Sequence, residues 1–152
     1  MRLASNFKII PVLRTADYNN GVAADSIDIT KAHRVTYVLV FGAITGDSIL
    51  TVKSGVANAD QTTALTFKYA MGSAALGTTG SDVLGTMSTS AALTLTGTTF
   101  VNMMLIVEVD MSQITLATHK FLTMAIDATA SAGIVTAIAV VEPRYSDGTT
   151  LV

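Results

Sequence analysis

The sequence predicts an all-β fold: a single β-sandwich, jelly-roll-like, with an extended N-terminal arm and at most one short helix. Threonine, alanine and valine dominate the composition, with 23, 21 and 15 copies among 152 residues, and β-branched side chains favour strands over helices. Apolar residues alternate with polar ones in several short segments, which are separated by breaks containing glycine or serine. This rhythm is typical of sandwiches and barrels rather than of βαβ units.

Length and composition indicate a globular protein with one domain. The 152 residues fit one hydrophobic core, and half of them are hydrophobic while 13% are charged, which excludes intrinsic disorder. The net charge is −2 and basic residues do not cluster, so we expect no nucleic-acid partner. The absence of cysteine excludes disulfides, thiolate catalysis and cysteine-bound zinc.

The first part of the chain differs in pattern from the rest. Residues 1–25 contain Pro11 and an Asn-Asn-Gly turn at residues 19–21, and we expect them to form an extended N-terminal arm. A β-sandwich domain spanning residues 26–152 follows, and its first strand is expected at residues 26–30.

Hydrophobic periodicity places the next strands. Residues 35–41 are apolar at almost every position, which predicts a central strand covered on both faces. A turn at residues 45–47 leads to a strand at residues 49–53. Residues 65–69 and 93–96 alternate apolar with polar side chains, so each strand should have one buried and one solvated face.

The C-terminal half continues this organisation. Residues 101–109 predict another strand that is apolar on both faces. The one helix candidate covers residues 111–118, where Asp110 or Ser112 would cap the first turn. The remaining strands are expected at residues 121–127 and 134–142, the last of them ended by Pro143.

Residues 71–90 contain four glycines among serine, threonine and alanine, which predicts a long flexible loop with a short edge strand at residues 82–86. Gly72 and Gly77 have the spacing of the P-loop glycines, but Thr78-Thr79 stands where that motif requires lysine and a hydroxyl residue. We interpret the segment as a surface loop suited to contacts with a partner.

The longest stretch without a charge, residues 83–107, is long enough to span a bilayer. It carries a hydroxyl or amide side chain at many positions, which favours a strand with one wetter face over a membrane helix. Residues 1–20 lack the continuous apolar core of a secretory signal. We therefore expect no membrane partner, and we expect the protein to stay in the compartment where it is made.

Candidate catalytic side chains are few. The two histidines, His33 and His119, are too few for a site of three imidazoles, and each stands beside a cation near an expected strand start. A Ser-His-Asp arrangement is compatible with the residue counts, but no Gly-x-Ser-x-Gly sequence supports it. We interpret both histidines as exposed turn residues.

Two pairs of carboxylates lie close in sequence, Asp25 with Asp28 and Glu108 with Asp110, and the second pair would share one face of a strand. Paired carboxylates can bind calcium or act as acid and base on a glycoside. No calcium-loop sequence is present and tryptophan is absent, so solvated charges at strand ends are the favoured interpretation. We expect no catalytic, cofactor-binding or metal-binding residues, no cofactor and no enzymatic activity.

The apolar surplus of the strands predicts association. One face of each sheet in a sandwich is normally wet, yet residues 35–41, 103–109 and 134–141 have few polar positions on either face. Coverage by a second copy is the favoured explanation, and coverage by long loops within a monomer is the alternative. Four methionines are expected to fill the core or a subunit interface: Met103, Met104, Met111 and Met124.

Three segments resemble small virion proteins of tailed bacteriophages. Residues 26–47 combine an acidic strand start, an alternating strand, Gly-Ala-Ile-Thr and a tight turn, and residues 49–56 lead into a loop containing Asp60. Residues 138–145 resemble the apolar strand and Pro-Arg-Tyr ending of such chains. The sequence departs from the family at residues 56–61, where the family often has a longer hairpin rich in aspartate and glycine.

The resemblance implies a β-sandwich protein of the phage head (the virion), made in the host cytoplasm. It implies a capsid decoration (cement) protein whose partners are the major capsid protein and copies of itself, with a homotrimer favoured. Residues 1–25 and 71–90 would be the segments that clamp neighbouring capsid subunits. The alternatives are a tail or fibre component, and a carbohydrate-binding or adhesive module. The last would need exposed aromatic residues, and Tyr37 is expected to be buried among the four tyrosines: Tyr18, Tyr37, Tyr69 and Tyr145.

Overall fold

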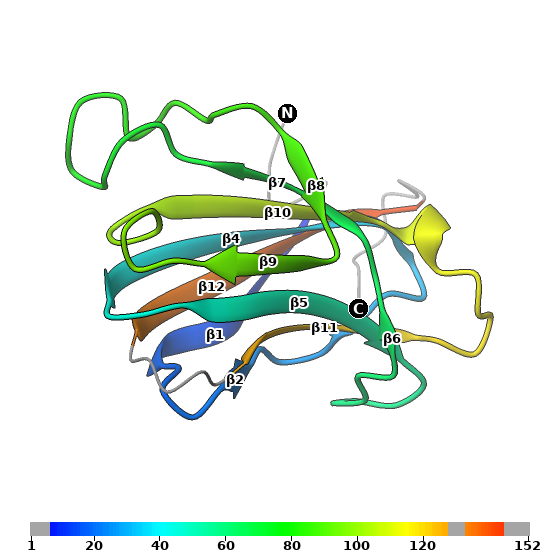
Figure 1. The fold of residues 1–152 in the computed structure, drawn as a ribbon. Coiled ribbons are helices and arrows are strands. Elements are labelled where there is room, and N and C mark those ends of the chain that lie inside the picture. Colours follow the sequence, from blue (N-terminus) through cyan, green and yellow to red (C-terminus); the bar gives the residue numbers. More distant parts are fainter. Residues whose placement is uncertain (1–6, 128–132, 145–152) are drawn as a thin grey trace.

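Two antiparallel β-sheets pack face to face in the computed structural model, which describes residues 7–127 and 133–144 (Figure 1). The predicted all-β sandwich is confirmed, while its likeness to a jelly roll stays a prediction. The one helical element among the described residues is the 3-10 turn η1 (Met111–Gln113).

The larger sheet, sheet A, has six strands. In spatial order they are β1 (Lys8–Asp17), β12 (Gly133–Pro143), β4 (Ala32–Ile44), β10 (Met104–Asp110), β7 (Phe67–Met71) and β8 (Ser88–Ser90). Sheet B is built on the antiparallel pair β11 (Phe121–Asp127) and β5 (Ser48–Gly55). Short strands flank this pair, β2 (Val22–Ala23) and β3 (Ile27–Asp28) beside β11, and β6 (Thr63–Ala64) and β9 (Ala92–Leu95) beside β5.

The core lies between the two sheets. Because side chains alternate along a strand, every second residue of β4 points inward, and four of these are buried: Val35, Tyr37, Leu39 and Phe41. They belong to one cluster with Leu50 of β5 and Leu122 of β11. The ring of Phe41 meets that of Phe100 edge-on, with 6.1 Å between the ring centroids.

The predicted strands from residue 26 onward are present, except the edge strand expected at residues 82–86. β11 begins and ends at the predicted residues, whereas β4 is longer than residues 35–41 and β3 is shorter than residues 26–30. The edge strand expected at residues 82–86 lies instead at β8, and within the expected range only Leu84 forms an isolated bridge, to Gly72.

The helix expected at residues 111–118 is wrong beyond its first turn. Asp110 does cap it, because its carboxylate accepts a hydrogen bond from the backbone N–H of Ser112. The chain becomes extended at Ile114, and the β-branched pair Ile114-Thr115 is unfavourable for continuing a helix.

The described part of residues 1–25 is extended as predicted, but it belongs to the sandwich and is not a separate arm. β1 pairs with β12 as an edge strand of sheet A, and Val12 and Tyr18 are buried in the core. The ring of Tyr18 occupies the space where any side chain on Gly133 would stand, and Tyr18 N–H donates to the carbonyl of Gly133. A domain boundary at residue 25 is therefore not seen in the described residues.

Candidate interaction surfaces

One of the two histidines has a serine partner in the structure. His119 Nδ1 lies 2.8 Å from the hydroxyl oxygen of Ser54, so His119 is a half-buried, partnered residue and not an exposed one. Ser54 is 1% exposed, which closes it to a substrate. The carboxylate of Asp60 accepts hydrogen bonds from Val56 N–H and the Thr62 hydroxyl. The contact between His119 and Ser54 therefore links β5 to the segment before β11. His33 is exposed, as predicted, but lies within β4.

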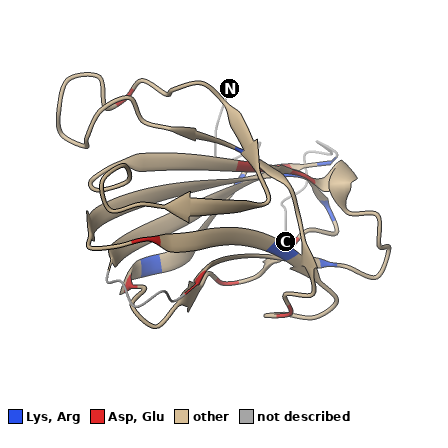
Figure 2. Cartoon of the chain, viewed as in Figure 1, with Lys and Arg blue, Asp and Glu red and all other residues tan. Residues whose placement is uncertain are grey.

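The carboxylate candidates serve local structure. Asp28 accepts hydrogen bonds from the backbone N–H and the hydroxyl of Thr30, and the backbone bond is the main cause that lowers the pKa of Asp28. Asp25 is exposed. Glu108 and Asp110 share the outer face of sheet A, as predicted, because their cross-strand partners on β4 are Thr36 and Arg34. Figure 2 shows that charged residues lie mainly at strand ends and in loops.

The described residues lack two further features. No group of three or more His, Asp or Glu side chains there is arranged to hold a metal ion, and no helix there is long and apolar enough to cross a membrane. Gly72 and Gly77 are followed by turns and short strands, without the helix that a P-loop requires.

The outer face of sheet A is apolar over its centre. Ile138 of β12, Val38 of β4 and Ile106 of β10 lie side by side in one cross-strand row. Val40 and Ile134 are exposed next to this row, and Ile138 itself is 38% exposed. We call this surface the sheet A apolar face; its residues are Ile9, Val38, Val40, Met104, Ile106, Ile134, Ile138 and Val140.

One end of the sheet A apolar face is bordered by charges. Arg34 of β4 donates two hydrogen bonds to Glu142 of β12, at 2.8 and 3.0 Å, and lies 4.0 Å from Glu108 of β10. These side chains are partly exposed. The surface therefore combines an apolar centre with a charged border at one end. Protein–protein interfaces usually have an apolar centre and polar edges.

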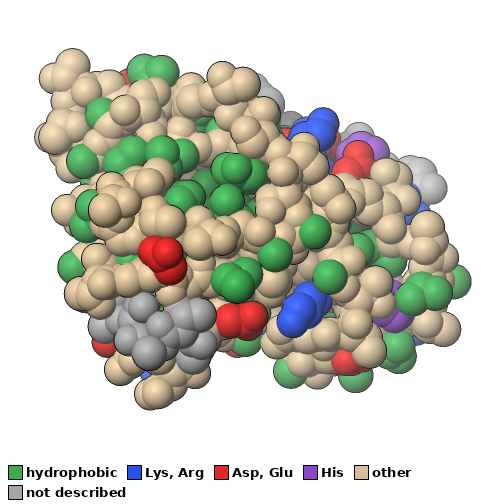
Figure 3. Space-filling model, in the orientation of Figure 1, with side chains coloured by type: hydrophobic (Ala, Val, Ile, Leu, Met, Phe, Trp, Pro, Cys, Tyr) green, Lys and Arg blue, Asp and Glu red, His purple; other side chains and the backbone are tan. Residues whose placement is uncertain are grey.

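The outer face of sheet B has a different composition. Thr51 and Ala125 are cross-strand partners there, and Thr123 pairs with Lys53. Thr51, Thr123 and Ala125 are buried, and Thr123 is hydrogen-bonded to Ser26. On the face of the molecule that carries β9 and β5 in front, Figure 3 shows hydrophobic side chains gathered mainly between β9 and the segment above it.

That segment, residues 72–87, projects from the end of β7 (Figure 1, upper left). Its base is a hydrogen-bonded hairpin, in which Ser73 N–H donates to the carbonyl of Val83 and Gly85 N–H donates to the carbonyl of Met71. Large apolar side chains on it are exposed: Leu76, Val83, Leu84 and Met87. The predicted surface loop is confirmed, but it is tied by backbone hydrogen bonds.

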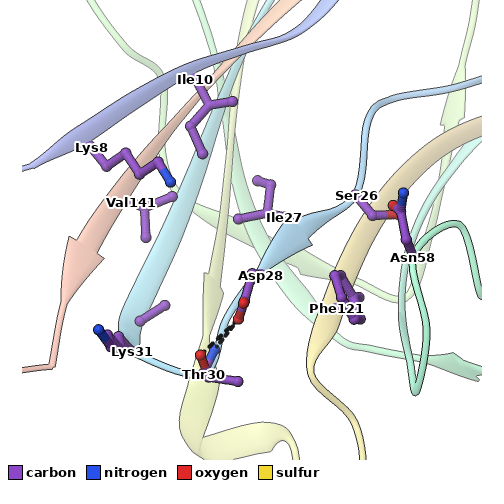
Figure 4. A pocket seen from close by; sticks show the side chains of 11 residues that line it. Lys8, Ile10, Ser26, Ile27, Asp28, Thr30, Lys31, Asn58, Phe121 and Val141 are labelled. Carbon is purple, nitrogen blue, oxygen red and sulfur yellow. Dashed lines mark hydrogen bonds between the residues drawn. The ribbon is translucent and has the colours of Figure 1, made fainter. Parts of the chain in front are cut away.

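A cleft of about 600 Å³ opens between the two sheets where β1 and β12 approach β3 and β11 (Figure 4). Its apolar floor comes from Ile10, Ile27, Phe121 and Val141. Lys8 extends across the opening towards Val141, and Lys31 lies at the rim. The lining residues come from five separate parts of the chain, so no sequence motif predicts the cleft.

The aromatic residues offer little surface for stacking on a sugar. Tyr18 and Tyr37 are fully buried, and Tyr69 packs against Phe67. Tyr145 lies outside the described residues.

In comparisons with known proteins, no family model matches the chain, and no curated protein or solved structure shows significant similarity to it.

Proposed function

We propose that this protein is a structural component of a tailed-bacteriophage particle, a capsid decoration protein that binds the major capsid protein and copies of itself. The observation that carries the proposal is the sheet A apolar face. Ile134, Ile138 and Val40 are exposed on this face, and contiguous exposed apolar patches on soluble proteins often mark interaction sites.

Covering this face would supply binding energy without any reactive group. Burial of apolar surface contributes roughly 25 cal/mol per Å², and a stable interface buries about 800 Å² on each partner. A protein that clamps a shell needs such contact area and slow unfolding.

The two clamping segments implied by the resemblance take different roles in this proposal. Within residues 1–25, β1 is built into sheet A and contributes Ile9 to the sheet A apolar face. Residues 72–87 project from the sandwich and keep the role of a clamp. The homotrimer and the location in the phage head rest on the sequence resemblance.

Addition to expanded, undecorated capsids tests the proposal. We expect the wild-type protein to add at a fixed molar ratio to the major capsid protein. Ile138→Lys should weaken this addition at least about tenfold, because a charge would enter the buried centre of the contact. The matched control is Thr94→Lys, which places the same charge on the exposed outer side of β9 in sheet B.

Failure of the wild-type protein to add to such capsids, or equal addition by both variants, would contradict the proposal. Circular dichroism of each variant checks that the sandwich still forms. The position of the protein in a cryo-EM map of the particle distinguishes the head from the tail or fibre alternative. Saturable binding on a glycan array would instead favour the carbohydrate-binding alternative.

A further inference from the structure

We propose that the 72–87 segment of one copy docks into the Lys8–Lys31 cleft of the next copy, so that copies of the chain associate head to tail. The inference deepens the proposed function and rests on its self-association part. The occupant of the cleft is a second copy of this chain.

The projecting segment carries a carboxylate beside two exposed apolar side chains. Asp82 is exposed, Val83 is 55% exposed and Leu84 is 45% exposed. An apolar side chain left in water next to an acid is suited to a site with an apolar floor and a basic rim. Residues 82–84 thus place one acidic and two apolar side chains on a part of the molecule that projects from the sandwich.

The segment is held in place for binding. Both the N–H and the hydroxyl of Ser73 donate to the carbonyl of Val83, at 2.7 and 2.8 Å. Gly77 and Gly80 have φ angles of +80° and +86°, a backbone conformation that glycine adopts without strain and that turns the chain at the tip. The hydrogen bonds at its base reduce the conformational entropy that this part of the segment loses on docking.

The cleft is complementary to this segment in polarity and charge. Ile27 and Val141 are buried in its floor, while Lys8 and Lys31 provide positive charge at its opening. The one carboxylate of the cleft, Asp28, accepts both hydrogen bonds from Thr30 (Figure 4) and also attracts Lys8, so two lysines and one carboxylate leave the lining with a net positive charge. Its volume of about 600 Å³ lies within the roughly 300–1,000 Å³ of ordinary binding pockets.

The placement of the two surfaces requires two copies. In Figure 1 the 72–87 segment lies at the upper left, whereas the light-blue chain of residues 26–32 lies at the right end of the sandwich. A contact between different surfaces of identical chains is heterologous, and it closes into a ring when its rotation allows. The trimer in the proposed function is one such ring.

Charge reversal within one chain tests the contact, with association constants measured by sedimentation equilibrium. We expect Asp82→Lys to weaken self-association at least about tenfold, and the pair Lys8→Glu with Lys31→Glu to do the same. The variant that combines all three substitutions should regain most of the wild-type association, because each acidic cleft then meets a basic segment. Asp127→Lys, the same charge change at the end of β11, is the control and should associate like the wild type.

Val83→Ser is an independent test in case charge reversal in the cleft disturbs folding. Because Val83 is exposed, this substitution should weaken association without affecting stability. Wild-type protein that stays monomeric at all concentrations, or association that Asp82→Lys and Val83→Ser leave unchanged, would overturn the contact. Capsid addition is measured separately. Normal addition by a protein that does not self-associate would overturn this contact while leaving capsid binding by the sheet A apolar face intact.

Discussion

The two outer faces of the sandwich differ in how many large apolar side chains they expose. Sheet A presents branched and long side chains such as Val40 and Ile138, and these remain partly in water. On sheet B the outward residues Thr51, Thr123 and Ala125 are small and buried, and Ile49 is the large apolar side chain that its central strand pair exposes. A strand that is apolar on both faces thus indicates a missing partner only where its outward side chains are large.

The largest expected effect is a difference in stability between substitutions on the inner and the outer face of one strand. Leu39 and Val40 are neighbours on β4, but Leu39 is buried in the core and Val40 lies on the sheet A apolar face. Leu39→Ala should lower the free energy of unfolding by about 2–5 kcal/mol, because it leaves a cavity. Val40→Ala should cost under about 1 kcal/mol. Urea denaturation of the two variants measures both, and equal losses would contradict the assignment of faces.

A smaller effect is expected from a polar atom on the inner face. The hydroxyl of Tyr37 is buried and has no hydrogen-bond partner among the described residues, and this burial raises its pKa above the ordinary value. Tyr37→Phe should raise the free energy of unfolding by about 1–2 kcal/mol, because it removes an unsatisfied buried group. Tyr69→Phe, at a half-buried ring, is the control and should change little. A loss of stability in Tyr37→Phe would mean that the hydroxyl has a partner.

The charged border of sheet A should contribute little to folding. Arg34 and Glu142 are partly exposed, so Arg34→Ala should cost only about 0.2–1 kcal/mol. The difference from the wild type should shrink in 1 M salt, where the Debye length is about 3 Å. Thermal unfolding at low and high salt measures this, and a loss that does not depend on salt would assign Arg34 a packing role instead.

The smallest expected effect is the contribution of Asp110 to the loss of stability at low pH. Hydrogen bonds from Ser112 lower the pKa of Asp110, so its carboxylate stabilises the fold above its ordinary pKa and loses this contribution as the pH falls through the lowered value. Asp110→Asn keeps a good cap for η1 and does not titrate. Its urea midpoint should equal that of the wild type near pH 7 and fall less steeply below about pH 4. Parallel curves would contradict the shift.

Most of the fold could be predicted because strand periodicity is a local signal. The alternation around Tyr37 and Leu39 predicted β4 and its two apolar faces, and residues 121–127 matched β11 in full. β1 was missed as a sheet strand because Pro11 interrupts the pattern and register shifts on both sides of Leu13 disturb the alternation. Proline is tolerated there because β1 is an edge strand.

The interaction surfaces were only partly accessible from the sequence. The apolar surplus of residues 35–41 predicted an uncovered face, but only the register shows that Val38 stands between Ile138 and Ile106. The cleft is lined by residues of both sheets, such as Lys8 of β1 and Phe121 of β11, a relation that no local pattern contains.

Site-specific labelling most directly tests the claim that sheet A, and not sheet B, faces a protein partner. The natural sequence has no cysteine, so Val40→Cys and Thr94→Cys each provide a single thiol on one outer face. Maleimide labelling rates are compared between dilute free protein and capsid-bound protein. We predict that the Val40→Cys thiol reacts in the free protein and is at least about tenfold protected on the capsid, while the Thr94→Cys thiol reacts alike in both. Equal labelling of the Val40→Cys thiol in the two states would contradict the account.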